Sequence, residues 1–291
     1  MKVNALLDWC DQSGRSVSDV VREPELLKSR LTDDQLASID SSTAVIEEEL
    51  TSEEVQLLGG LDSDYPPLLR KGMRRKAPPL LYCRGNTELL SKTSIGFCGS
   101  RKASEKGIAT ARDCAEQLAE KDIVVISGYA AGVDITTHTA ALRAGGATII
   151  VLPEGILHFR IKSEIKDNWD WDRVLVVSHF EPRLPWSVRN AMARNSIICG
   201  LSKAMILIEA GTTGGSIAAG RTCLEMGRPL FAPVYEGMPE SAAGNRILLN
   251  QGAHPLLKNR HTKRAAIEKV TKLIEMPDSD KEGAKQISLF A

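Results

Sequence analysis

Glycine and serine residues follow apolar runs at three places in the sequence, a combination that suits the binding of phosphate groups. Gly99-Ser100-Arg101 follows "SIGFC", Ser127-Gly128 ends "DIVVISG", and Gly214-Gly215-Ser216 follows "AMILIEA". Glycine lets a phosphate approach the backbone, and a helix start beside it offers unpaired N–H groups and a positive dipole end. The planar guanidinium of Arg101 matches the oxygens of a phosphate. Tight packing explains a single such loop equally well, but three together favour a phosphate site.

The segment "ARNSIICGLS" adds two candidates, because it lies just before the apolar run "AMILIEA". Arg194 and Asn195 would stand at the same edge if their helix enters from that side, whereas the alternative is a solvated helix end. The glycine spacing matches neither G-x-G-x-x-G nor G-x-x-x-x-G-K-[ST], so we expect no dinucleotide or other cofactor. The predicted phosphate-binding residues are Gly99, Ser100, Arg101, Ser127, Gly128, Arg194, Asn195, Gly214, Gly215 and Ser216.

Several acidic and histidine side chains near these loops could transfer protons, yet spacing alone identifies no nucleophile–base pair. His138 follows Asp134 by four residues, which is compatible with an acid–base pair or with a helix-capping aspartate beside a packed histidine. His179 follows another apolar run, and Glu209 precedes the last glycines, where it is expected to orient loop amides or Arg101. The sequence thus predicts no catalytic residues and favours a protein that is not an enzyme.

The residues between 61 and 260 alternate between short apolar runs and amphipathic segments such as "ASEKGIATARDCAEQLAEK". This alternation predicts a doubly wound, mostly parallel α/β sheet of the Rossmann-like type, with helices on both faces. Ligands of such sheets bind outside the carboxyl ends of the strands, so the glycine loops would meet at one edge. The predicted strands are "TSIGFCG", "DIVVISG", "ATIIVLP", "RVLVVSHF", "AMILIEA" and "PLFAPV".

Two smaller segments flank this domain. Residues 1–60 carry apolar residues at helical spacing and predict a small N-terminal helical domain, in which "TSEEVQLL" has the Ser/Thr-x-x-Glu form of a helix start. Residues 261–291 begin with a basic helical pattern, "HTKRAAIEKVTKLIEM", and then turn polar at "PDSDKEGAKQ". We expect one helix followed by a flexible tail.

Composition limits the classes of protein that this chain can represent. Its 291 residues are 43% hydrophobic and contain 37 Lys+Arg and 37 Asp+Glu, so net charge does not indicate nucleic acid, although a local basic cleft is compatible with it. The six cysteines form no C-x-x-C pair, which predicts buried free thiols rather than a metal site. With no apolar run near 18 residues, we expect a cytoplasmic protein without a membrane segment.

With these residues assembled, the chain resembles the DprA (Smf) family of DNA-processing proteins. The similarity covers residues 61–258 and is carried by four blocks in the family's order: "YPPLL…APPLLYCRG", "GSR", "VVISGYAAGVDITTHTAALRAGGATIIVLPEG" and "RNSIICGLSKAMILIEAGTTGGSIAAGRTCLEMGRPLFAPV". The closing "GNRILLNQGAHPL" is similar to the family's last motif. As a set, these blocks are specific.

The resemblance implies a function in DNA processing, recombination and natural transformation. A member of this family binds single-stranded DNA without cutting it and helps to load the RecA recombinase, and we expect a homodimer. The residues predicted above would then contact DNA phosphates. Ala131 and Ser196 stand where the family has basic residues, so the chain is identified as a divergent member. A nucleotide-binding enzyme of the phosphoribohydrolase type, or a specialised copy in defence or DNA modification, stays open as the alternative.

The end of the chain resembles a docking peptide. Residues 286–290 read "QISLF", similar to the Q-L-[SD]-L-F peptide by which bacterial polymerases and repair proteins bind the β sliding clamp. Leu289 and Phe290 suit a hydrophobic pocket, and Gln286 would fix the register. The alternative is an ordinary C-terminal tail with an apolar end.

Overall fold

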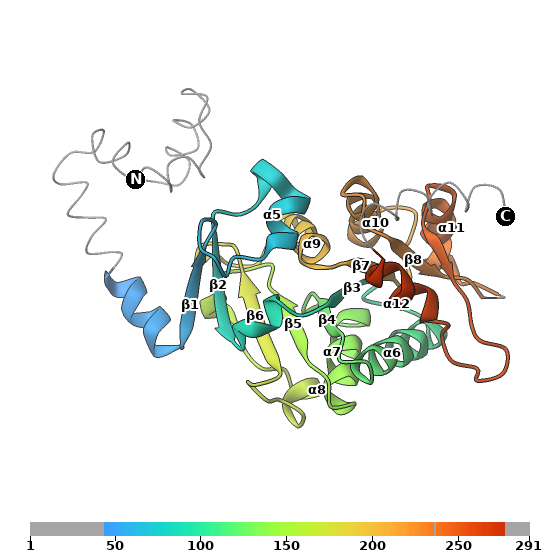
Figure 1. Cartoon of the computed structure of the whole chain (residues 1–291), viewed down its shortest axis with the longest axis horizontal. Coiled ribbons are helices and arrows are strands. Elements are labelled where there is room, and N and C mark those ends of the chain that lie inside the picture. Colours follow the sequence, from blue (N-terminus) through green and yellow to red (C-terminus); the bar gives the residue numbers. More distant parts are fainter. Residues whose placement is uncertain (1–43, 236, 277–291) are drawn as a thin grey trace.

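A nine-stranded, mostly parallel sheet forms the centre of the molecule (Figure 1). The computed structural model describes residues 44–235 and 237–276. Along the sheet the strands run in the order β1-β2-β6-β5-β4-β3-β7-β8-β9. Their bounds are β1 Val55–Gly59, β2 Leu80–Gly85, β3 Ser94–Cys98, β4 Val124–Ser127, β5 Thr148–Val151, β6 Val174–Ser178, β7 Ala204–Leu207, β8 Leu230–Pro233 and β9 His254–Leu256.

All six predicted strands are present, as β3 to β8, and they pair in parallel. The fold class predicted from their apolar runs is therefore confirmed. The prediction missed three strands: β9 extends the parallel part, whereas β1 and β2 form an antiparallel end on β6. Antiparallel strands that expose one face carry fewer apolar residues than buried parallel ones, which weakens their signal.

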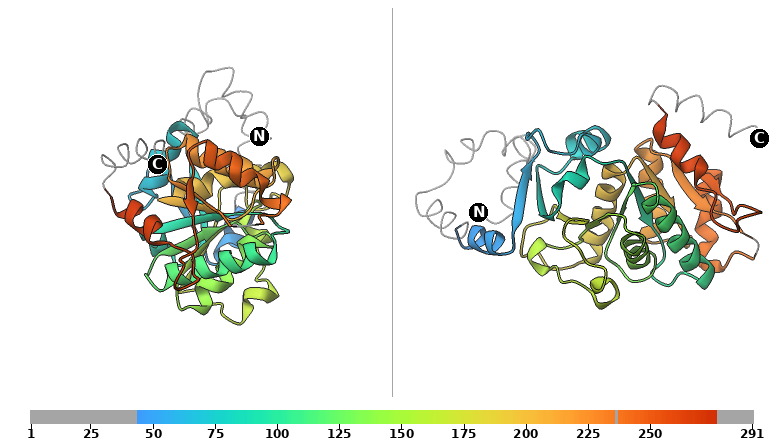
Figure 2. Two further views of the ribbon diagram at one scale, coloured as in Figure 1. Left: turned by 90° about the vertical axis from the view of Figure 1, so that its right-hand side faces the viewer. Right: turned by 60° about the horizontal axis from the view of Figure 1, so that its bottom comes forward.

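Helices cover both faces of the sheet (Figure 2). The helices are α5 Pro67–Met73, α6 Glu105–Ala119, α7 Val133–Arg143, α8 Ser163–Lys166, α9 Val188–Leu201, α10 Gly215–Glu225, α11 Ala243–Asn250 and α12 Glu268–Glu275. Strand residues alternate between the layers: Leu207 packs with the layer of α5, α9, α10 and α11, and Ile206 with that of α6, α7 and α12. This period of two follows from the pleat of a strand.

The chain order creates a crevice at the middle of the sheet. From β3 the chain moves outward through β4, β5 and β6, and then returns to place β7 on the other side of β3. The loops after β3, β4 and β7 therefore leave the same edge of the sheet as neighbours. This reversal of strand order is where open α/β sheets bind their ligands.

The N-terminal segment differs from its prediction where the structure describes it. "TSEEVQLL" does not begin a helix: residues 44–52 are helical, and a turn then leads into β1. Val55 is buried and its strand pairs with β2, so tertiary packing overrides the capping pattern. The sheet thus includes residues that precede 61. The predicted helices within residues 1–43 lie outside the described residues, and so does the docking peptide at 286–290.

Two further observations bear on composition. The cysteines at positions 83, 98, 114, 199 and 223 are buried free thiols, as expected, and Cys10 lies outside the described residues. Within residues 44–235 and 237–276, no helix is long and apolar enough to cross a membrane.

Candidate functional site

We call the loops that follow β3, β4 and β7 the rim; they comprise residues 99–104, 128–132 and 208–214. A buried ion pair lies beneath it. Arg194 of α9 is only 5% exposed, and its Nη2 lies 3.9 Å from Oδ2 of Asp134 at the start of α7. Its Nη1 donates to the carbonyl of Val151 at 2.6 Å. Burial raises the pKa of Asp134 and lowers that of Arg194, so each charge needs the other.

Asp134 and His138 hold the end of β4 and the loop that follows it. The Ser127 hydroxyl donates to Oδ1 of Asp134 at 3.0 Å, and the backbone N–H of Ala130 donates to Oδ2 at 3.3 Å. His138 lies 2.5 Å from the carbonyl of Gly128 and 2.6 Å from the Thr148 hydroxyl. Because a carbonyl only accepts, Nε2 of His138 carries the proton. Burial lowers the pKa of this histidine to about 4, so the ring is neutral at pH 7.

The first two predicted glycine loops are closed by packing. A Cβ at Gly128 would overlap the Arg194 guanidinium, and one at Gly99 would lie 2.5 Å from Val133. Gly132 has a φ of +80°, and its Cα faces the carbonyls of Ser100 and Arg101 across the rim. At these positions glycine serves close contact between loops, which is the alternative that the sequence left open.

The third loop is open. A Cβ at Gly214 would meet nothing within 4 Å, and one at Gly215 would meet only Nδ2 of Asn195, at 3.9 Å. Gly214 begins α10 without a side-chain cap, whereas Ser104 caps α6 through the backbone N–H of Gly107. The first N–H groups of α10 therefore lie at an exposed helix start, where a phosphate can reach them.

Glu209 connects the loops around this opening. Its carboxylate accepts hydrogen bonds from Ser104, through both N–H (2.9 Å) and hydroxyl (2.5 Å), from the Tyr235 hydroxyl (2.5 Å) and from the Ser241 hydroxyl (2.9 Å). Burial alone would raise the pKa of Glu209, but these hydrogen bonds outweigh it and the pKa lies below its ordinary value. Its carbonyl also accepts from the N–H of Ser100 at 2.8 Å. Glu209 thus orients the loop after β3, as the sequence predicted.

Arg101 is the exposed arginine of the rim, and the neighbouring Lys102 is exposed as well. Its backbone lies next to Gly132, and its guanidinium carbon lies 5.8 Å from the ring centroid of Trp186. The Arg101 charge also lowers the pKa of Asp134, although burial and Arg194 affect that carboxyl more strongly. The exposed guanidinium and the buried pair are therefore electrostatically coupled.

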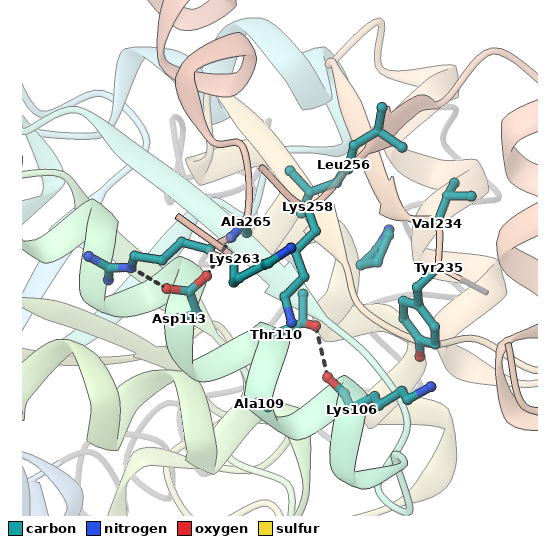
Figure 3. A pocket seen from close by; sticks show the side chains of 13 residues that line it. Lys106, Ala109, Thr110, Asp113, Val234, Tyr235, Leu256, Lys258, Lys263 and Ala265 are labelled. Atoms are coloured by element: carbon teal, nitrogen blue, oxygen red, sulfur yellow. Dashed lines mark hydrogen bonds and ion pairs between the residues drawn. The ribbon is translucent and has the colours of Figure 1, made fainter. Parts of the chain in front are cut away.

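A cavity of about 520 Å³ opens beside the rim (Figure 3). We call it the lysine cavity, because Lys106, Lys258 and Lys263 line it together with apolar Val234, Leu256 and Leu257. Its walls come from α6, the ends of β8 and β9, and the segment 263–265. Tyr235 lies between the two regions: it lines the cavity, and its hydroxyl bonds to Glu209. None of the predicted phosphate-binding residues lines this cavity.

The structure decides between alternatives that the sequence left open at two places. Arg194 is buried under the rim and does not stand on a solvated helix end. His138 and Asp134 form no acid–base pair, since they bond to different partners and His138 is fully buried. Sequence reasoning also missed Tyr235, Ser241 and Trp186, because nothing in the spacing of these residues relates them to the rim.

Comparison with known proteins gives a family match. The model of the family described as DNA recombination-mediator protein A matches residues 56–266. The chain is 33% identical over 181 residues to DNA processing protein DprA of Streptococcus pneumoniae, which covers 61% of this chain and 63% of the relative. It is 34% identical over 192 residues to protein Smf of Escherichia coli, covering 65% of this chain and 50% of the relative. The chain thus spans between half and less than two thirds of these relatives.

Solved structures agree with the fold. The X-ray structure of DprA from Streptococcus pneumoniae has a TM-score of 0.66 and 27% identity, and the match covers 86% of this chain and 87% of the other. The DprA structure from Helicobacter pylori, which describes the single-stranded DNA binding mode of that protein, has a TM-score of 0.59 and 24% identity. This second match covers 76% of this chain and 94% of the other, and it shows the fold alone.

Proposed function

The chain belongs to the DNA recombination-mediator protein A family, and from this premise we propose that it binds single-stranded DNA along the rim without cutting it. The DprA protein of Helicobacter pylori, described for its single-stranded DNA binding, supports the choice of ligand. Relatives named as DNA processing proteins support the general process. The protein therefore acts in DNA processing and recombination.

The observation that carries the proposal is the open start of α10 at the same edge of the sheet as an exposed guanidinium, since their loops follow the neighbouring strands β7 and β3. The amides at Gly215 and Ser216 provide fixed donors, and Gly214 leaves the space before them free. Arg101 provides a second, charged donor across the crevice. Phosphate contacts of this kind carry no base information, so the binding is independent of sequence.

Arg194 supports this site from below. It is buried against Asp134, Val151 and Gly128, so it holds the loop after β4 in place and adds positive potential beneath the rim. Gly99 and Gly128 likewise shape the loops through packing. Of the ten residues predicted from the sequence, the amides of the α10 start, Ser100, Arg101 and Asn195 are those that meet the phosphates.

The alternative, a nucleotide-hydrolysing enzyme, is not favoured by the geometry. Glu209 would be its acid or base, yet the hydroxyls of Ser104, Tyr235 and Ser241 occupy this carboxylate. His138 is buried and bonded to the backbone. Neither group is free to transfer a proton to a bound substrate.

The wider context is part of the same proposal. The bound strand is passed to RecA during recombination or natural transformation, and the protein works as a homodimer in the cytoplasm.

The tail residues Gln286, Leu289 and Phe290 dock on the β sliding clamp. Deleting residues 286–291 then abolishes capture by purified clamp, and unchanged capture contradicts the docking.

Binding of labelled oligo(dT) across a salt series tests the function. The logarithm of the affinity should fall linearly with the logarithm of the salt concentration, by about 0.7 for each phosphate contacted. Binding that is absent at low salt, with a folded protein, contradicts the proposal.

A further inference from the structure

Three exposed apolar side chains lie near the start of α9, and one of them, Trp186, is a neighbour of Arg101. Trp186 is 47% exposed, Val188 64% and Met192 49%, and all lie at the start of α9 or just before it. Val188 and Met192 are four residues apart, so they share a face of the helix. Among the large hydrophobic side chains that are exposed in the described part of the chain, Trp186 is the aromatic one. We call Trp186, Val188 and Met192 the tryptophan patch.

The backbone around Trp186 is fixed although its side chain is exposed. Ser187 caps α9 by accepting from the N–H of Asn190 at 3.1 Å. The N–H of Leu184 bonds to the carbonyl of Glu181 at 2.9 Å, and the carbonyl of Leu184 accepts from Gly155 at 2.8 Å. The indole is therefore presented from a rigid loop, which reduces the entropy lost when a ligand packs on it.

The indole and the guanidinium of Arg101 are neighbours, 5.8 Å apart from ring centroid to Cζ. A guanidinium near an aromatic face is a weak interaction when both groups are exposed, so it does not explain why the tryptophan is kept at the surface. The two groups together match a nucleotide, since the cation suits the phosphate and the flat ring suits the base. Base–aromatic stacking is how proteins hold single strands irrespective of sequence.

From this pairing we propose that the tryptophan patch is a stacking platform, on which Trp186 holds the unpaired base next to the phosphate that Arg101 contacts. The inference rests on the proposed function and deepens it, because it makes the rim selective for unpaired strands. In a duplex the bases are stacked inside and cannot reach the indole. Arg189, exposed on the same turn of α9, adds charge that suits nucleic acid rather than an apolar protein partner.

The test compares two labelled oligomers with the same number of phosphates: oligo(dT) and an oligomer of abasic sites. By fluorescence anisotropy, Trp186→Ala should weaken oligo(dT) binding about 5- to 100-fold and leave abasic binding unchanged. Trp186→Phe should restore most of the affinity for oligo(dT). Leu57→Ala removes a side chain of similar exposure, 48%, in β1 and serves as the control without effect.

Three outcomes overturn the platform. If Trp186→Ala leaves oligo(dT) affinity unchanged while the native chain binds both oligomers, the proposed phosphate site is kept and the stacking platform is contradicted. If the variant loses affinity for both oligomers equally, Trp186 only supports Arg101. If the native, folded chain binds neither oligomer, both the proposed function and the stacking platform are contradicted.

Discussion

Two regions at the same edge of the sheet differ in how they present positive charge. The rim offers backbone amides, one exposed guanidinium and a buried ion pair beneath them. The lysine cavity is a hollow of about 520 Å³ that is lined by three lysines and by apolar side chains. Ammonium groups on flexible stems are hydrated point charges, whereas amides at a helix start are fixed before the ligand arrives. We therefore place the proposed site at the fixed donors of the rim and not at the cavity.

The ion pairs of the two regions differ as well. Arg194 and Asp134 are buried under the rim, with side chains 7% and 9% exposed. Arg264 and Asp113, beside the cavity, are 38% and 22% exposed. Charges in water lose little when a partner is removed, whereas a buried charge without its partner is costly.

The largest expected effect follows from this contrast. Arg194→Ala should lower the free energy of unfolding by about 3–5 kcal/mol, because Asp134 is left buried without a counter-charge. Arg264→Ala should lower it by about 1 kcal/mol or less. Urea denaturation of both variants measures the difference, and equal losses would show that the rim does not depend on its buried pair.

A second difference between the regions is their response to acid. The pKa of His138, under the rim, is lowered by burial from about 6.5 to about 4, so folding favours the neutral ring. Its contribution to stability is complete above pH 6.5 and is lost as the pH falls towards 4, by roughly 3 kcal/mol. The lysine cavity is lined by no histidine.

His138→Gln should therefore flatten the dependence of unfolding free energy on pH between 6.5 and 4. His179, whose pKa burial likewise lowers to about 4, keeps its own part of the slope in this variant. A pH series of denaturant titrations measures the change. A variant whose curve stays parallel to that of the native chain would contradict a neutral, buried His138.

Gly128 in the rim and Gly215 at the adjoining start of α10 distinguish a structural role from a binding role. Gly128→Ala should cost about 1–3 kcal/mol of stability, because the new methyl group displaces the paired Arg194 guanidinium. Gly215→Ala meets only Asn195 at 3.9 Å and stands in a helix, so stability should be kept. Its methyl group would instead hinder phosphate approach and lower oligo(dT) affinity about tenfold. The opposite pattern would exchange the roles assigned to the two loops.

The sequence predicted more of the fold than of the candidate site. Short apolar runs marked β3 to β8, and their order placed the three glycine loops at one edge. The sequence could not tell that Gly128 faces a guanidinium while Gly214 faces open space, since both stand after a strand. That difference depends on Arg194, which is distant along the chain and whose burial depends on Asp134 and Val151.

The lysine cavity and the tryptophan patch could not be predicted either, because they too are formed by residues that are distant along the chain. The cavity is built from segments around residues 106, 234 and 257, which no local pattern connects. No sequence pattern singles out Trp186, and only its distance to Arg101 relates it to the rim. β1 was missed because a capping pattern precedes it, while its pairing with β2 is a long-range contact.

The central claim is that fixed donors of the rim hold the phosphates, and that the lysine cavity contributes only screened attraction. Salt-dependent binding of oligo(dT) to two variants tests it most directly. Arg101→Ala should weaken binding at least about tenfold at 0.15 M salt and reduce the slope by about 0.7. The triple variant Lys106→Gln, Lys258→Gln, Lys263→Gln should weaken binding at low salt, with an effect that fades as screening increases. An unchanged affinity in Arg101→Ala, together with loss of binding in the lysine variant at 0.15 M salt, would place the strand in the cavity and contradict the account.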